Sequence, residues 1–465
     1  DSGAHWQDVT PGALTAWSKV AAVEPSHFDL QSAYIAVDRH RLDDPRPYIY
    51  RTHDGGASWT LIADGIADGG VHNSVNVVRE DPVRRGLLYC GTERGVYFSL
   101  DDGVHWQPLQ RNLPRTSVRD LDVHGVDLVI ATHGRGFWIM DDIAPLRALA
   151  DDAGDDSRLL PPAPAYRIRP TGFLGSPMPK DEPMGANPSA GAYIDYVLAP
   201  GTTGVVELTI TDSRGASVRS FRSDDAPARP DLTKSVIAPE WIQAPAVLAN
   251  GAGAHRFVWD LHYAPRPMLV SDDLELNDEG VWAAPGKYGL ELKAGGQVYR
   301  RSLAVLADPR VKLTPEAYTR QFALAREIED ARVEIARALT ETRRIHTSIV
   351  EHRRNAGGAD AVALSDLETQ LAAVSDPEPP KRSPDSTGPP PTTTHGLRYL
   401  EAAFRDLARA VDGADAAPSI DAERGFVLER ASLDATLAQW RQLRTEALPR
   451  LNMQLKASGA PPIAP

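Results

Sequence analysis

Three acidic residues near the start of the chain are the side chains best suited to acid–base chemistry: Asp43, Asp44 and Glu93. Hydrolysis of a glycosidic bond uses two carboxyl groups, one protonated and one ionised, roughly 5 to 9.5 Å apart. No sequence motif joins two of the three into such a pair. They are therefore candidate catalytic residues by type alone.

Basic residues accompany these acids and predict a surface able to hold a sugar or a peptide. The candidate ligand-binding residues are Arg41, Arg46, Arg94, His133 and Arg135. Two of them, Arg94 and Arg135, recur at equivalent places in a repeated turn. The alternative interpretation is therefore that each Arg forms an ion pair with a neighbouring loop and stabilises the turn, and both interpretations stay open.

A repeated motif accounts for the spacing of these charged stretches. Residues 52–59 and 99–106 both spell Ser/Thr-x-Asp-x-Gly-x-x-Trp, and residues 1–6 carry the same pattern from its Asp onward. In such a turn the Asp carboxylate accepts from downstream amides, Gly permits positive φ and Trp returns to the core. We expect structural roles for the motif residues: Asp1, Gly3, Trp6, Asp54, Gly56, Trp59, Asp101, Gly103 and Trp106.

The spacing of this motif predicts a β-propeller. Successive motif Asp residues lie 53 (54 minus 1) and 47 (101 minus 54) positions apart, close to the length of about 40 to 50 residues of a propeller blade. Short β-branched or aromatic runs between turn residues predict the strands. We expect strands at 5–9, then at 20–23, 33–37, 48–51 and 59–62, then at 74–79, 86–91, 95–99 and 105–109, and finally at 120–123, 127–132 and 136–140.

These repeats resemble the bacterial Asp-box (BNR-repeat) proteins with sortilin/VPS10-like propellers, which are often labelled glycosyl hydrolases. Residues 79–89, 91–97 and 131–138 carry the resemblance beyond the motif itself. It implies a secreted, periplasmic or cell-surface protein and places this chain in the C-terminal part of the family pattern. It also implies that the Asp-box carboxylates lie away from any active site.

The predicted propeller is incomplete. Residues 1–147 contain the last blades only, whereas closed propellers use about four to eight blades. We expect an N-terminal remainder of a longer protein, or a second chain, to supply the missing blades and to cover the open strand edges.

Residues after 147 predict two further domains. A linker is expected at 148–165, and an immunoglobulin-like β-sandwich at 166–308 with strands at 166–169, 193–198, 205–211, 217–221, 256–260, 288–293 and 297–305. A helical hairpin or bundle is expected at 309–458, interrupted by a disordered Pro-, Ser- and Thr-rich loop at 375–395. The fold class is therefore multidomain and mainly β, with C-terminal helices.

The longest helix is predicted to begin after Thr314, an N-cap residue, and to run to Arg354. Apolar and small residues along it alternate spacings of three and four, which is typical of a helix packed along other helices. These residues are Leu324, Ile328, Ala331, Ile335, Ala338, Thr342, Ile345 and Ile349. Helices at 362–374 and around the apolar stripes 400–411 and 433–451 are its expected partners, and Pro449 is expected to bend the last one.

Composition excludes several function classes. The net charge of −13 and the absence of a basic cluster exclude nucleic acid as a general partner. The apolar runs are too short to span a membrane. Cys90 is the only cysteine, and we expect a buried strand thiol. Phosphate-binding loops and zinc-type Cys or His spacings are missing from the sequence, so no cofactor and no metal site are predicted.

Two functions of different classes remain. The first is a peptide- or glycan-binding or scaffold protein. The second is a glycoside hydrolase acting on a polysaccharide, with its carboxylate pair at a propeller cleft. Exposed aromatic residues beside paired acids would favour the hydrolase, because aromatic rings stack on sugars, and Trp17, Tyr48 and Trp138 are the candidates.

Overall fold

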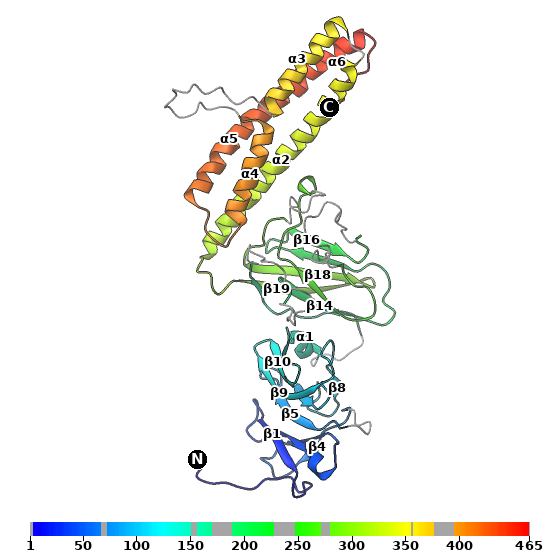
Figure 1. Ribbon diagram of the computed structural model, residues 1–465, viewed down its shortest axis with the longest axis vertical. Helices are drawn as coiled ribbons and strands as arrows, with labels where there is room; N and C mark the ends of the chain where they lie inside the picture. The colour runs from blue at the N-terminus through cyan, green and yellow to red at the C-terminus, as the bar shows by residue number, and fades with distance from the viewer. Residues whose placement is uncertain are drawn as a thin grey trace.

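The computed structural model describes residues 3–66, 72–149, 156–169, 188–226, 247–270, 280–354, 357–375 and 395–464. Three bodies follow one another along its long axis (Figure 1). Small antiparallel sheets lie at the N-terminal end, a pair of larger sheets lies in the middle, and helices form the C-terminal end.

The N-terminal body consists of three successive antiparallel sheets, which we call blades 1, 2 and 3. Blade 1 contains β1 (Lys19–Pro25), β2 (Ala33–Asp38), β3 (Tyr48–Thr52) and β4 (Thr60–Leu61). Blade 2 contains β5 (Val75–Glu80), β6 (Leu88–Thr92), β7 (Val96–Ser99) and β8 (Gln107–Pro108). Blade 3 contains β9 (Ser117–His124), β10 (Asp127–His133) and β11 (Phe137–Met140). Each strand lies within a few residues of its predicted position.

The prediction of a strand at 5–9 was wrong for the described part of the chain. Residues 5–9 are in no strand, because no described strand lies beside them to complete a ladder of hydrogen bonds. The motif residue Trp6 is 90% exposed there. Asp1, the first residue of the same motif, lies outside the described residues.

The blades pack face to face through alternate residues of their strands. Val75 and Val78 of β5 join a buried cluster with blade 1, whereas Val77 joins a second cluster with blade 3. Cys90 of β6 is fully buried in the first cluster, and burial raises the pKa of its thiol. Side chains on the two faces of β5 thus link all three blades into one stack, and a register shift between Val75 and Val77 places Val75 on the same face as Val78.

The central body has two sheets around one buried core. A three-stranded sheet has the order β12 (Arg158–Leu159), β14 (Ala192–Leu198) and β17 (Gly253–Trp259). A five-stranded sheet has the order β13 (Ala165–Arg167), β19 (Gln297–Ala307), β18 (Gly286–Ala294), β15 (Glu207–Thr211) and β16 (Ser217–Arg222). β13 pairs in parallel with β19. The finer expectation of an immunoglobulin-like topology stays a prediction.

The expected linker at 148–165 contains some regular structure. The short helix α1 (Ala144–Leu149) ends within it, and β12 pairs with β14 of the central body. Leu159 of β12 is buried in the core of that body. This residue therefore contributes to the central core although it precedes the predicted domain boundary.

The C-terminal body is a bundle of α2 (Pro315–Arg353), α3 (Gly358–Ser375), α4 (Leu397–Asp412), α5 (Ile420–Gln442) and α6 (Leu448–Ala457). The Thr314 hydroxyl accepts from the Ala317 amide and so caps α2. The predicted seam of α2 is buried, with Leu324 partly buried. None of the described helices is long and apolar enough to cross a membrane. The loop predicted at 375–395 lies almost entirely outside the described residues.

A π-helical turn, Leu443–Ala447, replaces the simple bend predicted near Pro449. Pro449 follows at the second position of α6 and has no amide hydrogen, so it cannot donate to the carbonyl four residues earlier. The Leu448 amide instead donates to the carbonyl of Leu443, five residues back. The wider turn therefore lies directly before the residue that lacks a donor.

Arginines of the central body join it to both neighbours. Arg256 of β17 donates to the carbonyl oxygens of Asp141 and Asp142, each at 2.9 Å, next to blade 3. Arg167 and Arg169 form ion pairs with Asp412 and Asp415, which end α4 and begin the following loop. The three bodies are thus connected by buried or half-buried charge pairs.

Candidate functional site

The two complete Asp boxes form the same network of hydrogen bonds. Asp54 accepts from the Ser58 amide at 2.9 Å, and Asp101 accepts from the His105 amide at 2.9 Å. The Thr52 hydroxyl accepts from the Gly56 amide, and the Ser99 hydroxyl accepts from the Gly103 amide. These carboxylates therefore satisfy the turn itself and do not face a ligand.

Each box Trp also anchors its turn to a preceding segment. Trp106 Nε1 donates to the Ile62 carbonyl at 2.7 Å, and Trp59 Nε1 donates to the Val9 carbonyl at 2.8 Å. Val9 and Ile62 each lie three residues after the preceding box Trp. A Cβ on Gly103 would meet Ile62 Cδ1 at 2.4 Å, so glycine is needed for this approach. The box therefore fastens each blade to the segment before it.

The pKa of Asp54 gives a testable pH dependence. Hydrogen bonds from Ser58, side chain first, lower the pKa of Asp54 to about 2. Because this pKa is lower in the folded chain than in the unfolded one, the contribution of Asp54 to stability is complete above about pH 4. It is lost as the pH falls through the folded pKa. We expect the difference in free energy of unfolding between the wild type and Asp54→Asn to shrink over this range.

Denaturant titrations of both proteins at a series of pH values measure this difference. Asp64→Asn is the control. Asp64 also lies near the end of blade 1, but its carboxyl group is exposed and takes no part in an Asp-box turn. A wild-type advantage over Asp54→Asn that is constant or grows toward low pH would contradict the role given to Asp54.

The predicted charged residues lie in the three loops that join the second and third strands of their blades. We call residues 39–47, 93–95 and 133–136 together the loop face. The Asn73 amide donates to the Pro45 carbonyl, and the Glu93 amide donates to the Ser74 carbonyl. The Thr116 hydroxyl donates to the His133 carbonyl. The first loop is thus held by the segment that leads into blade 2, whereas the second and third loops are held by the segments that lead into the first strands of their own blades.

The acidic candidates differ in their surroundings. Asp44 accepts from Arg46 Nε at 2.8 Å and from the Tyr48 hydroxyl at 2.7 Å. The hydrogen bond from Arg46 holds the pKa of Asp44 well below its usual range. Glu93 pairs with Arg119 at 3.0 Å and accepts from Asn76. Both carboxylates are therefore partners in loop contacts, and the lowered pKa of Asp44 makes that residue unsuited to donate a proton as a general acid.

Asp43 differs because its side chain is exposed. It has the left-handed φ of 58° and ends a short 3-10 turn, His40–Leu42. Asp43 and Asp44 are adjacent, and Glu93 belongs to the next blade. The structure does not bring the three together in an enclosed cleft among the described residues.

The basic candidates fall into two groups. Arg46 is held by Asp44, and its guanidinium lies 5.5 Å from the centre of the Tyr48 ring. The side chains of Arg41, Arg94 and Arg135 form no ion pair with another described residue, and Arg41 and Arg135 are exposed. His133 is also exposed. Several cations of the loop face are therefore available to a ligand.

Most of the aromatic candidates are not exposed in a way that would let a sugar ring stack on them. Tyr48 is buried under Arg39 and Arg46. Trp138 packs partly on the core of blade 3, and its Nε1 donates to the Arg135 carbonyl. Only Trp17 of the three is largely exposed, at 80%. This arrangement weakens the hydrolase interpretation.

A further group beside the loop face was missed by sequence reasoning. Asp38 at the end of β2, His40 two residues later and His72 just before β5 each offer one ligand atom within 4.8 Å of the others. Asp38 and His40 alone form an Asp-x-His pattern, which is a weak signal. Only the packing of blade 2 against blade 1 adds His72.

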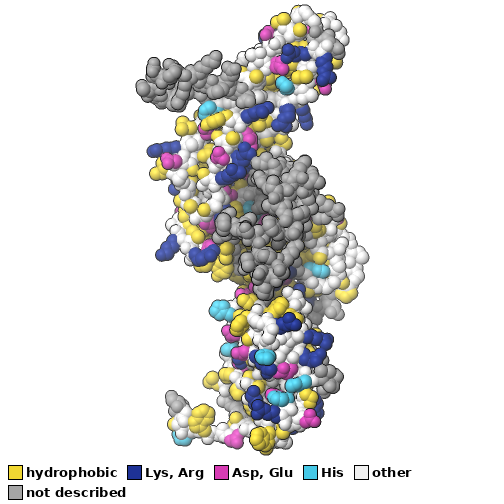
Figure 2. Space-filling model, in the orientation of Figure 1, with side chains coloured by type: hydrophobic (Ala, Val, Ile, Leu, Met, Phe, Trp, Pro, Cys, Tyr) yellow, Lys and Arg dark blue, Asp and Glu magenta, His cyan; other side chains and the backbone are white. Residues whose placement is uncertain are grey.

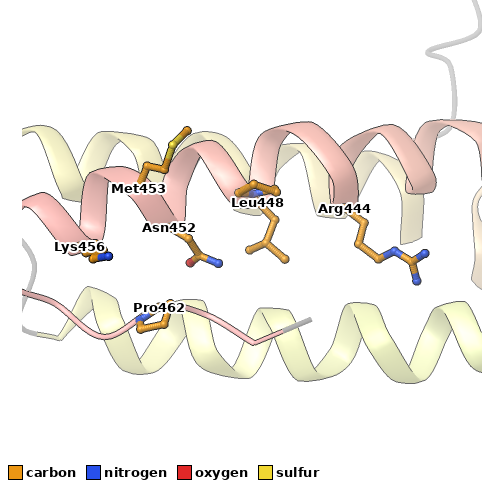
Figure 3. A pocket seen from close by; sticks show the side chains of 7 residues that line it. Arg444, Leu448, Asn452, Met453, Lys456 and Pro462 are labelled. Atoms are coloured by element: carbon orange, nitrogen blue, oxygen red, sulfur yellow. The ribbon is translucent and has the colours of Figure 1, made fainter.

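Other hollows lie away from the loop face. A groove of about 700 Å³ follows α6 beside the C-terminal segment, and Figure 3 shows its lining residues. Another, of about 990 Å³, lies among α2, α3 and α4. In the N-terminal body, Figure 2 shows Lys, Arg, Asp, Glu and His side chains interspersed over the visible surface. Neither groove contains a residue predicted from the sequence to act in binding or catalysis.

No family model and no curated protein matches this chain. Solved structures match parts of it. YCF48 bound to D1 peptide is 20% identical over 27% of this chain and 36% of that chain, with a TM-score of 0.20. The GH74 xyloglucanase from Xanthomonas campestris is 13% identical over 65% and 50%, with a TM-score of 0.26. The GH74 enzyme from Niastella koreensis is 10% identical over 61% and 46%, with a TM-score of 0.22.

This chain thus spans half or less of the length of these structures. TM-scores this low support no inference about function. The comparisons thus give a distant similarity over part of the chain, whereas the mixed β sheets followed by C-terminal helices are a feature of this chain's own structure.

Proposed function

We propose that this chain is a binding module of an exported Asp-box propeller protein and that its loop face binds peptides or glycans bearing anionic groups. The observation that carries the proposal is the set of cations Arg41, Arg94 and Arg135 on equivalent loops of three adjacent blades, without ion-pair partners among the described residues. Carboxylates of acidic peptides or of uronic-acid sugars match guanidinium geometry. Export rests on the family resemblance alone.

Binding is favoured over glycoside hydrolysis by the state of the acids. Asp44 and Glu93 each form an ion pair with an Arg, and the lowered pKa of Asp44 makes it a poor candidate for the protonated acid that hydrolysis needs. Catalysis would therefore need a proton donor other than Asp44. We therefore keep hydrolysis as the alternative, without a residue assigned to it.

We also propose that further Asp-box blades, from another segment or another chain, pack beside blade 1. Trp59 and Trp106 each donate to a carbonyl of a preceding segment, whereas Trp6 donates only to Gly3 within its own turn. Trp6 is the residue that such a blade would cover. At the other end of the stack, Phe137 and Ile139 of β11 are exposed beside an edge that no strand of the described residues pairs with.

The loop-face proposal predicts that the triple variant Arg41→Ala, Arg94→Ala, Arg135→Ala binds acidic ligands more weakly than the wild type. Exposed charge pairs contribute about 0.2 to 1 kcal/mol each, so three lost pairs weaken binding by roughly 3-fold to 100-fold. Calorimetric titration with oligogalacturonate and with a polyglutamate peptide measures the change. Added salt should weaken wild-type binding, because exposed pairs are screened.

A charge-matched control removes three exposed arginines of the helical bundle, by Arg354→Ala, Arg424→Ala and Arg450→Ala. This variant has the same net charge as the loop-face variant and should bind like the wild type. Equal affinity of both variants would show that only overall charge matters and would contradict a site on the loop face. Failure of the wild type to bind either ligand would contradict the proposal itself.

A further inference from the structure

Asp38, His40 and His72 form a small cluster where blades 1 and 2 meet. The Asp38 carboxylate is buried, whereas both imidazoles are exposed, so the acid forms the base of a shallow site that is open to solvent. His40 Nδ1 lies 2.7 Å from the Asp38 carboxylate, and the ring centres of His40 and His72 are 5.6 Å apart.

Backbone and side-chain contacts hold this cluster in place. The His40 amide donates to Asp38 Oδ1 at 3.0 Å, and His72 Nε2 lies 3.0 Å from the Ser74 hydroxyl. Burial raises the pKa of Asp38, but the hydrogen bonds from His40 and Ser74 outweigh it and leave the pKa below its usual value. Asp38 is thus an ionised carboxylate beside two imidazoles.

We propose that Asp38, His40 and His72 bind a divalent transition-metal ion, with zinc the best match. Two imidazole nitrogens and one carboxylate oxygen are a donor set that zinc accepts, at about 2.0 to 2.2 Å from each donor. Their ligand atoms lie within 4.8 Å of one another, so no pair of them needs to contract by more than about 1.5 Å to reach tetrahedral spacing.

The chain itself allows this contraction. His40 lies on the loop after β2, and its side chain is about half exposed, so its ring can turn without disturbing a packed core. In the hydrogen bonds described above, each imidazole uses one ring nitrogen and retains another. His72 lies on the segment that leads into β5, and Asp38 ends β2, so the site lies between two packed blades while His72 stands outside the strand itself.

Three protein ligands leave one tetrahedral position for water or for a donor atom of a ligand, as in zinc sites that remain open. That position lies on the solvent side, because the buried carboxylate occupies the opposite side. The ion would add positive charge on the side of the blades that also carries the arginines of the loop face. Metal binding does not depend on an acidic ligand and can be tested without one.

The test is calorimetric titration of the full, untagged chain with zinc chloride, and with cobalt chloride followed by visible absorption. We expect one ion per chain and a cobalt spectrum typical of tetrahedral nitrogen and oxygen ligands. Loss of an outer-shell partner alone weakens metal sites 10- to 100-fold, so His72→Ala, which removes a direct ligand, should weaken zinc binding by about 100-fold or more.

His124→Ala is the matched control, because His124 is an exposed histidine of blade 3 outside the cluster. Both His variants should unfold at the wild-type denaturant concentration without metal, which separates loss of a ligand from misfolding. Equal zinc affinity of His72→Ala and His124→Ala would overturn the proposal. Less than one ion per wild-type chain would also overturn it.

Discussion

Replacing Trp106 by Ala is expected to lower the free energy of unfolding of the N-terminal body by about 3 to 5 kcal/mol. Trp106 is only 3% exposed and belongs to the buried cluster between blades 1 and 2. Its Nε1 donates to the Ile62 carbonyl at 2.7 Å, so the substitution also leaves a buried carbonyl without its donor. The cavity and the lost hydrogen bond act together.

Trp6→Ala is the matched control, because Trp6 has the same place in the same motif but is 90% exposed. Its removal should change stability by less than about 0.5 kcal/mol. Denaturant titration followed by circular dichroism and by the fluorescence of the remaining tryptophans measures both variants. Similar losses for Trp6 and Trp106 would contradict the view that the box acts by fastening one blade to the preceding segment.

The second large effect is expected for Asp415→Ala, at about 3 to 5 kcal/mol. Asp415 lies 3.1 Å from the Arg167 guanidinium, whose side chain is only 2% exposed, and it also pairs with Arg169. Removing the acid leaves a buried guanidinium with Asp412 at 3.9 Å as its nearest remaining carboxylate. Burial lowers the pKa of Arg167, and the carboxylates of Asp415 and Asp412 act against this shift.

The control for this prediction is Glu291→Ala. This substitution removes the carboxylate that pairs with Arg300 in the central body, an ion pair more exposed than that of Arg167 and Asp415. Exposed pairs are worth about 0.2 to 1 kcal/mol, so a small loss is expected. Because the chain has several bodies, unfolding should be followed by limited proteolysis between the central body and the bundle as well as by denaturant. An Asp415 variant as stable and as resistant to proteolysis as Glu291→Ala would refute the role of this joint.

Local sequence patterns predicted the secondary structure well because local forces decide it. Alternating β-branched residues and the turns between them located the strands of all three blades, and the repeated seam of α2 located its buried face. In these elements, the period of the apolar residues coincides with the period of the backbone. The π-helical turn near Pro449 was expected only as a bend, since sequence shows where a donor is missing but not how the chain adjusts.

Features that depend on distant contacts could not be predicted. The run 5–9 has the pattern of a strand, but a strand exists only beside a partner. The pairing of Arg167 with Asp415 joins residues 248 positions apart (415 minus 167), and no local pattern indicates such a contact. The three candidate metal ligands likewise meet only because blade 2 packs on blade 1.

The candidate site was predicted in part for the same reason. Equivalent positions within the repeats indicated that the charged loops share one side of the blades, and a ligand site there stays a prediction. Sequence could not show that Glu93 is held by Arg119, because Arg119 belongs to the next blade. That neighbour changes Glu93 from a candidate acid into a structural ion-pair partner.

The proposal that these blades belong to a larger Asp-box propeller is tested most directly by cross-linking mass spectrometry on the purified native particle. We expect cross-links from residues near Trp6 to another segment that carries Asp boxes, on the same polypeptide or on a companion chain. We also expect the Trp6 ring to be protected from oxidative labelling in that particle. A particle that consists of this chain alone, with Trp6 freely labelled, would contradict the proposal.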